Sequence, residues 1–379
     1  MKIRFPEGSY TLLADPLKVH KPKVPFNRVA FAAAHVVADA RASADPSGPP
    51  AIDWDCTLAY RRHLLDLGFG VAEAMDTSQR GMGLDWPSAL DLIGRSLSEA
   101  GRRRNMIFSG AGTDQLDPAR ARSLDDVVRA YLEQFNAIQK LEGRIIMMAS
   151  RALVRVAKSP DDYVKVYSRV LQEADHPVIL HWLGDMFDPA LKGYWGSTDF
   201  HPAMETCLAA ITGNVKKIDG IKISLLDDSK EIDMRRRLPS PVKMYSGDDF
   251  SYPALIAGDA HGYSHALLGI FDAIAPAASA ALSALTKGDI KKYDRLLAPT
   301  VPLSRLIFRA PTQYYKTGIV FLAWLNGHQD HFVMVNGAQA MRPLPYFTEA
   351  FKLADQARLL SDPDMAVKRM KMLLGLYGT

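Results

Sequence analysis

The sequence has few cysteines, no long hydrophobic run and no hydrophobic leader. Its 379 residues include two cysteines, Cys56 and Cys207, too few for a disulfide framework or a Cys-rich zinc site. No apolar stretch approaches the roughly 18 residues that a transmembrane helix needs, and residues 1–6 lack the apolar core of a signal peptide. These absences predict a cytoplasmic protein of a reducing compartment, with no membrane partner.

The sequence also has little excess of charge of either sign. Lys and Arg total 46 against 42 Asp and Glu, which gives a formal net charge of +4. The densest basic runs are two arginine triplets, at 102–104 and 235–237, and runs this short are typical of solvated helix ends. The sequence therefore predicts no nucleic-acid partner.

Short apolar segments alternate with longer segments of helical spacing over most of the chain. Strands alternating with helices predict a parallel sheet, and eight such units favour a closed (β/α)8 TIM barrel. The alternative, an open doubly wound sheet, would show a glycine-rich phosphate turn after its first strand, and Ala32-Ala33-Ala34-His35 has no glycine. The predicted strands are 28–37, 70–74, 105–109, 144–149, 177–182, 220–224, 242–245 and 262–264.

Three parts are expected along the chain. Residues 1–26 are rich in proline and predict an irregular segment or a short hairpin. Residues 27–275 hold the barrel, and residues 276–379 form a helical carboxyl-terminal extension packed on it. The long connection 182–215 should shape the pocket, because long βα loops lie at the catalytic end of a barrel.

Two residues near the carboxyl ends of strands are candidate catalytic groups. Lys222 lies in the apolar strand 220–224, where desolvation would lower its pKa and favour the neutral amine that Schiff-base chemistry needs. The alternative is a lysine that reaches water or pairs with a carboxylate. His181 ends the strand 177–182 and is either a general acid or base at neutral pH or a hydrogen-bonded core residue.

Polar residues follow two further strands. Asp248 and Asp249 follow the seventh strand and could bind a metal, bind a ribose, or accept hydrogen bonds from turn amides. A polar loop after the second strand is able to hold the oxygen atoms of a substrate. This loop contains Asp76, Thr77, Ser78 and Gln79.

The whole pattern resembles the dihydrodipicolinate synthase and N-acetylneuraminate lyase family of class I aldolases, from about Ile52 to Leu360. The strongest piece is Gly220-Ile221-Lys222, followed about twenty residues later by Ser246-Gly247-Asp248-Asp249. Residues 253–258, 285–289 and 342–345 also fit, and 262–264 match the strand-eight signature that ends at Ser264. The resemblance implies a Schiff-base Lys222, a substrate-binding Ser264, and a homodimer or homotetramer. We expect no cofactor and no bound metal.

The sequence also departs from that family. The family's two threonines after strand two hold the carboxylate of pyruvate, whereas here Asp76 precedes Thr77 and would repel a carboxylate. His181 replaces the family's proton-relaying tyrosine, and its imidazole pKa suits neutral pH better than a phenol. The arginine that holds a second carboxylate in the synthases is absent. An uncharged sugar derivative therefore fits the sequence better than pyruvate.

These features together predict a Schiff-base-forming lyase that acts on a small carbonyl compound, a sugar derivative or a 2-oxo acid. Aldol cleavage, condensation and dehydration all remain open. One alternative is a metal-dependent barrel lyase or isomerase that uses Asp248, Asp249, His181 and His261 as ligands. The other is a catalytically inactive barrel that binds a sugar.

Overall fold

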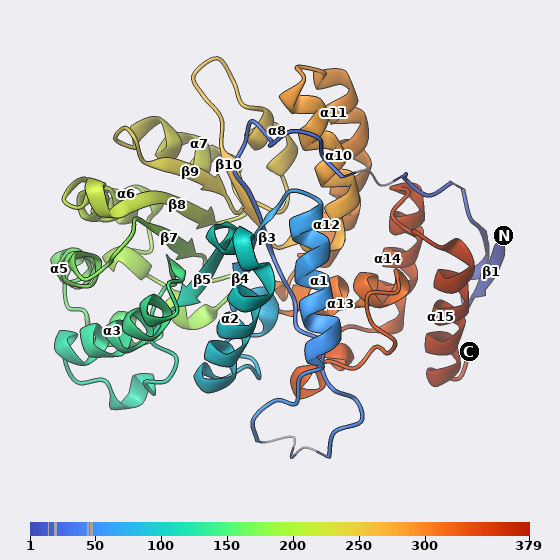
Figure 1. The fold of residues 1–379 in the computed structure, drawn as a ribbon, viewed down its shortest axis with the longest axis horizontal. Helices are drawn as coiled ribbons and strands as arrows, with labels where there is room; N and C mark the ends of the chain where they lie inside the picture. Colours follow the sequence, from blue (N-terminus) through green and yellow to red (C-terminus); the bar gives the residue numbers. More distant parts are fainter. Residues whose placement is uncertain (14, 19–20, 44, 46–47) are drawn as a thin grey trace.

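A closed barrel of eight parallel strands forms the larger part of the molecule (Figure 1). The computed structural model describes residues 1–13, 15–18, 21–43, 45 and 48–379. Neighbouring strands follow in chain order, and the last strand closes the ring against the first. The strands are β3 (Ala30–Ala33), β4 (Gly70–Glu73), β5 (Ile107–Ala111), β6 (Arg144–Met147), β7 (Val178–Leu183), β8 (Ile218–Ser224), β9 (Lys243–Ser246) and β10 (His265–Leu268). The predicted (β/α)8 barrel is confirmed.

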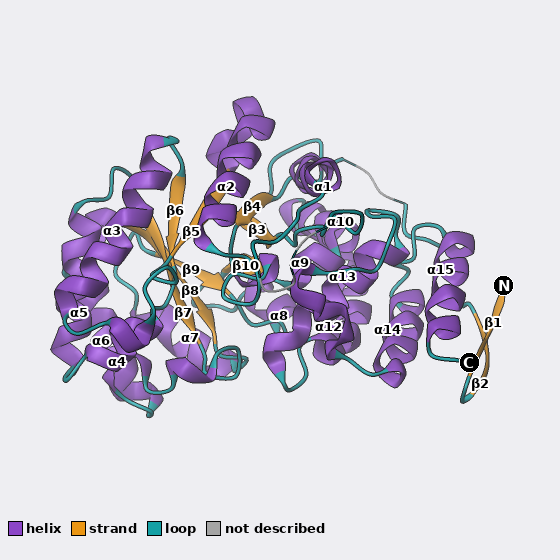
Figure 2. Ribbon diagram, turned by 90° about the horizontal axis from the view of Figure 1, so that it is seen from below, coloured by secondary structure: helices purple, strands orange, loops and turns teal. Residues whose placement is uncertain are grey.

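Helices follow the strands and surround the barrel, as Figure 2 shows. Several begin at a side-chain cap; Ser123 and Asp126 exchange side-chain-to-amide hydrogen bonds at the start of α3. The helices of this part are α1 (Trp54–Asp66), α2 (Trp86–Ala100), α3 (Leu124–Lys140), α4 (Arg151–Val156), α5 (Pro160–Gln172), α6 (Phe200–Thr212), α7 (Asp228–Arg237), α8 (Tyr252–Ala257), α9 (Ile270–Ala273) and α10 (Ala275–Thr286).

Strand side chains alternate between the barrel interior and the surrounding helices. Phe31, Phe108, Ile179 and Tyr245 belong to a cluster enclosed by the strands, whereas the intervening Ala32 packs in the larger core outside. Residues two apart in a strand share a face, so this cluster identifies which strand-end side chains point into the barrel.

The eighth barrel strand lies later in the chain than the sequence predicts. The predicted segment is 262–264, whereas β10 pairs with its neighbours from His265 to Leu268. Gly262 has a φ of 142° and accepts a hydrogen bond from the amide of Asp259, so this glycine belongs to a turn that leads into the strand. Ser264 therefore lies before β10 and not at its carboxyl end.

The carboxyl-terminal helices pack beside the barrel as a second helical body (Figures 1 and 2). The expected boundary at residue 276 falls within α10, whose Ser279 hydroxyl donates to the carbonyl of Leu67 next to α1. This helix therefore completes the ring around the barrel. The extension consists of α11 (Ile290–Leu297), α12 (Val301–Ile307), α13 (Tyr315–Leu325), α14 (Leu344–Gln356) and α15 (Pro363–Leu376).

The amino-terminal segment packs on this extension. Within residues 1–26, β1 (Lys2–Phe5) and β2 (Gly8–Thr11) form a hairpin, while residues 14, 19 and 20 lie outside the described part. The Tyr10 hydroxyl donates to the carboxylate of Asp355 at 2.7 Å. Both chain ends thus lie together at the edge of the molecule (Figure 2). In the described ranges, no helix has the length and hydrophobicity needed to cross a bilayer.

Candidate active site

Lys222 projects into the barrel from β8, the sixth barrel strand. Gly220, two residues earlier, pairs with the interior residue Ile179, so Lys222 shares this inward face. Its ladder partners are His181 on β7 and Tyr245 on β9. The two candidate catalytic residues therefore lie side by side on neighbouring strands.

The amine of Lys222 is nearly enclosed and has no polar partner. The residue is 7% exposed, and within the described part of the chain its Nζ forms no hydrogen bond or ion pair. Burial lowers the pKa of Lys222, while the nearby carboxylates of Asp249 and Asp76 oppose part of this shift. A lowered pKa increases the neutral, nucleophilic fraction of the amine at neutral pH.

Gly247 leaves the space that the Lys222 side chain occupies. A Cβ at this position would lie 2.8 Å from Lys222 Cε and 2.4 Å from Ser224 Oγ. It would also lie 2.5 Å from the carbonyl oxygen of Ile223, a backbone atom that cannot turn aside. Only glycine fits this position without displacing the lysine.

His181 is fully enclosed beside Lys222. A hydrogen bond of 3.1 Å joins its Nε2 to Ser224 Oγ on β8. Burial lowers the pKa of His181 well below its ordinary value, and the neighbouring Lys222 charge lowers it further. The expectation that this imidazole titrates near neutrality is therefore wrong. At neutral pH His181 is a neutral group that holds one ring proton and one acceptor nitrogen.

The loop after β4 places Asp76 near Lys222 but ties its other polar side chains to the protein. It opens with a short 3-10 turn, Asp76–Ser78. The Ser78 hydroxyl donates to the carbonyl of Met75, and the Gln79 amide donates to the carbonyls of Met82 and Val335. Ser78 and Gln79, two of the predicted substrate-binding residues, thus have structural partners.

Thr77 contacts a residue that was not among the predicted site residues. A 2.8 Å hydrogen bond joins Thr77 Oγ1 to the hydroxyl of Tyr315, which α13 of the extension delivers to the barrel mouth. Burial raises the pKa of Tyr315 well above its ordinary value, and Asp76 adds to this shift. Tyr315 therefore keeps its proton at neutral pH, and it stacks on Phe308 at 4.4 Å between ring centres.

The two acids after β9 diverge. Asp249 lies near Lys222 and accepts a hydrogen bond from the amide of Ile270 at 2.9 Å, and burial raises its pKa to about 7. Asp248 accepts hydrogen bonds from the amides of Phe250 and Ser251, so it orders the turn before α8. Of the alternatives that the sequence leaves open for Asp248, turn formation is the one its contacts match.

Ser264 lies away from the candidate site. Its hydroxyl donates to Glu231 on α7 at 2.7 Å, and the residue is fully buried. Burial raises the pKa of Glu231 to about 8. The resemblance placed Ser264 at a strand end facing substrate; its position before β10 and its bond to an outer helix contradict that role.

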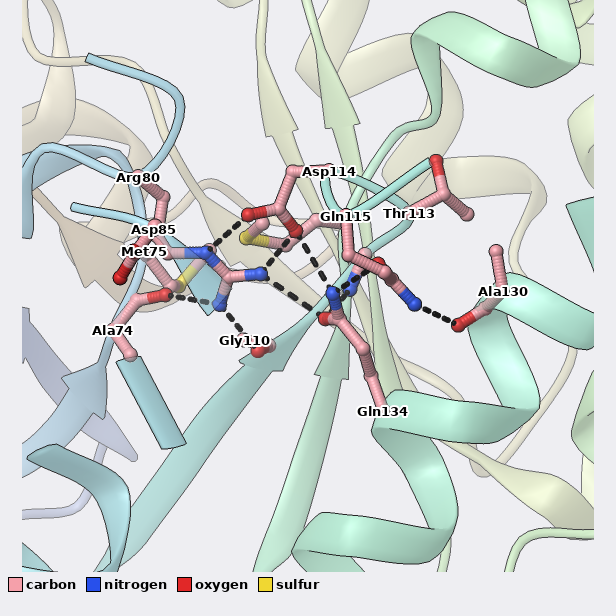
Figure 3. A network of polar contacts seen from close by, with 12 residues as sticks. Ala74, Met75, Arg80, Asp85, Gly110, Thr113, Asp114, Gln115, Ala130 and Gln134 are labelled. Carbon is pink, nitrogen blue, oxygen red and sulfur yellow. Dashed lines mark hydrogen bonds and ion pairs between the residues drawn. The ribbon is translucent and has the colours of Figure 1, made fainter. Parts of the chain in front are cut away.

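A buried arginine fixes the loop after β4. Arg80 binds both carboxylate oxygens of Asp114 and donates to the carbonyls of Ala74 and Gly110, each at 3.1 Å (Figure 3). Gln134 accepts a further hydrogen bond from Arg80 and donates to Asp114. Burial alone would raise the pKa of Asp114, but the Arg80 charge and the hydrogen bonds from Arg80 and Gln134 together outweigh it, so the pKa lies below its ordinary value.

A cavity of about 310 Å³ opens at the carboxyl ends of β4 to β7. His181 lines it, whereas Lys222 lies in the adjacent strand and is not part of the lining. A larger hollow, about 1100 Å³, lies between α2 and α3 and includes no strand-end residue. The charged residues that line the strand-end cavity are Asp76, Arg80, Asp114, Arg151, Asp188 and Lys316.

The ligands of the metal-dependent alternative are not gathered at one point. His181 is buried in the barrel, whereas His261 is exposed in the turn before β10. Among the residues that the structure describes, no group of three or more His, Cys, Asp or Glu side chains is arranged to hold a metal ion. The arrangement of these residues therefore does not match the metal-dependent alternative.

The strand order, the helical extension and the inward lysine of the sixth strand define a barrel of the dihydrodipicolinate synthase type. The chain belongs to the family described as "Protein of unknown function (DUF993)", which matches residues 6–379. Among curated proteins, none matches this sequence.

Solved structures with this fold share little sequence with the chain. The 4-hydroxy-tetrahydrodipicolinate synthase of Methylacidiphilum fumariolicum is 13% identical with a TM-score of 0.65, covering 91% of this chain and 99% of that one. The dihydrodipicolinate synthase of Acinetobacter baumannii is 15% identical with a TM-score of 0.64, covering 88% of this chain and 99% of that one. The synthase of Bacillus anthracis is 16% identical with a TM-score of 0.62, covering 89% of this chain and 99% of that one. Identities this low establish the fold, and the activity must be argued from this chain's residues.

Proposed function

We propose that this protein is a lyase that forms a Schiff base between Lys222 and a small carbonyl substrate. The observation that supports this most directly is the Lys222 amine, enclosed in the barrel without a hydrogen bond or ion pair in the described structure. A lysine buried without a partner carries a cost in stability, and covalent catalysis is a function that uses such an amine.

The proposed reaction begins with attack of the neutral Lys222 amine on the carbonyl carbon. A proton moves from nitrogen to oxygen to give a carbinolamine. A second proton, delivered to the carbinolamine hydroxyl, then lets water leave and gives the iminium ion. The iminium accepts the electron pair released when a carbon–carbon or C–H bond at its α-carbon breaks, which releases a carbonyl fragment or a proton and leaves an enamine. Protonation of the enamine carbon then gives the product iminium. Hydrolysis of the product iminium returns the free amine.

Two neutral hydrogen-bonding groups are available for these proton transfers. His181 lines the cavity beside Lys222 and is neutral, so it can accept a proton at one ring nitrogen and release one from the other. Tyr315, bonded to Thr77, is a protonated phenol near Asp76 and Asp249. We propose that His181 relays protons and that the Thr77–Tyr315 pair orients the substrate oxygen.

Borohydride trapping tests this proposal. The full chain is incubated with 2-oxo acids, ketoses or sugar aldehydes, reduced with sodium borohydride and weighed as the intact protein. We expect one stoichiometric secondary-amine adduct with at least one compound class, since reduction makes an iminium permanent. Absence of any adduct from folded protein would contradict the proposal.

The rate of trapping should depend on pH through the Lys222 amine. Because burial lowers its pKa, the neutral amine is present at pH values where an ordinary lysine is protonated. We expect the rate to rise with pH and to reach half its maximum below the ordinary lysine value of about 10.4. Reductive alkylation of surface lysines in the same samples is the control, and a Lys222 profile that follows theirs would contradict the assigned environment.

Gly247→Ala tests whether trapping depends on the position of the Lys222 side chain, because the variant keeps the lysine but displaces it. The added Cβ would lie 2.8 Å from Lys222 Cε and against the backbone of Ile223, so the lysine must move. We expect the trapping rate to fall at least tenfold, with a loss of stability of about 1–3 kcal/mol from overpacking. Gly375→Ala is the matched control, because a Cβ there meets no neighbour within 4 Å. An unchanged trapping rate in Gly247→Ala would show that Lys222 is not held by this contact.

A further inference from the structure

Two basic residues that line the strand-end cavity keep unused N–H groups. Lys316 comes from α13 of the extension, and Arg151 is the first residue of α4, directly after β6. Neither was singled out from the sequence. The hydrogen bonds of each side chain show which of its N–H donors have partners within the protein.

Lys316 is buried but has no close counter-ion. The residue is 5% exposed, and its Nζ donates to the carbonyl of Gln313 at 3.1 Å and lies 3.5 Å from Met82 Sδ. Within the described chain no carboxylate lies within the 4.0 Å of an ion pair, although Asp76 and Asp188 attract the amine from further away. Burial lowers the pKa of Lys316 to about 8, so the amine is mostly charged at neutral pH.

Arg151 uses one of its three guanidinium nitrogens. Its Nε donates to Asp188 at 2.6 Å, while Nη1 and Nη2 have no protein partner in the described structure. Gly81 leaves room beside this group, since a Cβ there would lie 3.7 Å from Nη2. The side chain is 46% exposed, which leaves the outer guanidinium edge open to a ligand.

The two cations also repel one another, because the Arg151 charge is one of the causes that lower the pKa of Lys316. Arg80, the third cation of the cavity, differs because its donors are occupied by Asp114, Gln134 and two carbonyls. We infer that Lys316 and Arg151 form an anion subsite that binds a carboxylate or phosphate group of the substrate. A guanidinium with two free nitrogens and an ammonium with a free N–H both suit such oxyanions.

The substrate class inferred here rests on the proposed function, because the Schiff base requires a carbonyl compound. The substrate would be a short carbonyl compound with its anionic group remote from the carbon that reacts with Lys222. The cavity of about 310 Å³ is at the lower end of the range for ligand pockets, which fits a short chain. An anionic substrate replaces the uncharged sugar derivative favoured by the sequence, because Lys316 and Arg151 supply the basic groups whose absence was one ground for that preference. The other ground, repulsion of a carboxylate by Asp76, places the anionic group away from Thr77.

Binding of non-carbonyl anions tests the subsite without Schiff-base chemistry. Succinate and inorganic phosphate are titrated calorimetrically into the full chain and into the variants Arg151→Met and Lys316→Met. We expect each substitution to weaken binding of at least one anion by tenfold or more, and Lys316→Arg to retain most of it. Arg169→Met is the control, since Arg169 forms a similar exposed ion pair with Asp125. Equal binding by all variants would overturn the inference.

Paired aldehydes then identify the anion and separate this inference from the proposed function. Succinic semialdehyde is compared with butanal, and glyceraldehyde 3-phosphate with glyceraldehyde, by trapping at Lys222. Faster trapping of an anionic member, lost in Arg151→Met, identifies the carboxylate or the phosphate. Equal trapping of neutral and anionic members would contradict the anion subsite and would leave the Schiff-base proposal intact.

The opposite outcome is anion binding that depends on Arg151 without any adduct on Lys222. This result would support the anion subsite and contradict the proposed lyase function. Arg151 is half-exposed, so its variant should fold even if Lys316→Met does not.

Discussion

Lys222→Met is expected to abolish borohydride-trapped adducts while leaving the protein folded and slightly more stable. The lysine pKa is lower in the folded state than in the unfolded state, so the wild type loses stability as the pH falls from about 10.4 toward the folded pKa. Methionine has no such loss and fills a similar volume. We therefore expect the free energy of unfolding at pH 6 to be higher in the variant than in the wild type.

The measurement is made at pH 6 because the Lys222→Met variant removes the positive charge nearest to Asp249. Burial raises the pKa of Asp249 to about 7, so this carboxyl is largely protonated at pH 6. At pH 10 its ionised form would be buried alone, and the gain should disappear. Lys165→Met, at an exposed ion pair with Asp162, is the control and should change neither property. A destabilised Lys222→Met at pH 6 would mean that the amine has a stabilising partner.

Arg80→Met is expected to lower the free energy of unfolding more than Gly247→Ala or any substitution at an exposed ion pair. It removes a buried cation that lowers the pKa of Asp114, whose side chain is 25% exposed, and it leaves the carbonyls of Ala74 and Gly110 without their donor (Figure 3). Breaking a buried pair on one side typically costs about 3–5 kcal/mol. Urea unfolding followed by tryptophan fluorescence would measure this loss.

The matched control for Arg80 is Arg129→Met. Arg129 also pairs with an aspartate, Asp126, but its side chain is 75% exposed, so the same substitution should change stability by about 0.5 kcal/mol or less. A loss under about 1 kcal/mol in Arg80→Met, the range of a surface pair, would show that the network of Figure 3 is not a stabilising element. The loop that carries Asp76 would then need another anchor.

The barrel could be predicted from the sequence because each strand is a short apolar run between helices of clear period. The eighth strand is the exception, because the segment predicted for it lies in the turn before the residues that pair. Residues 262–264 matched a family signature, whereas the apolar run that pairs begins with the next residues, His265 and Ala266. Ser264, which the resemblance implies to be a substrate-binding residue, lies in this turn and donates to Glu231.

The Lys222–His181 pair was also predictable, because both residues interrupt apolar strands whose register follows from barrel closure. The ionisation of His181 was not, since its pKa depends on complete burial beside a cation. Sequence position gives neither the depth of a side chain nor the charge of a neighbour from another strand.

Residues contributed by distant segments were missed for a geometric reason. Tyr315 and Lys316 come from the extension, and only the packing of α13 on the barrel brings them to the cavity. One signal was present in the sequence: Lys316 directly precedes the largely apolar run Thr317–Leu325, and a lysine at such a position needs a partner or a function. Arg151 follows the strand β6 and could have been found by the strand-end rule that identified Lys222.

The most direct test of this account is to identify which lysine carries the trapped carbonyl compound. Lys222 and Lys316 both lie near Asp76, and burial lowers the pKa of both. Peptide mass spectrometry of the borohydride-reduced wild-type protein distinguishes them, because they lie in different tryptic peptides. The account predicts the adduct on Lys222, with Lys316 unmodified. An adduct on Lys316, with Lys222 unmodified, would contradict it.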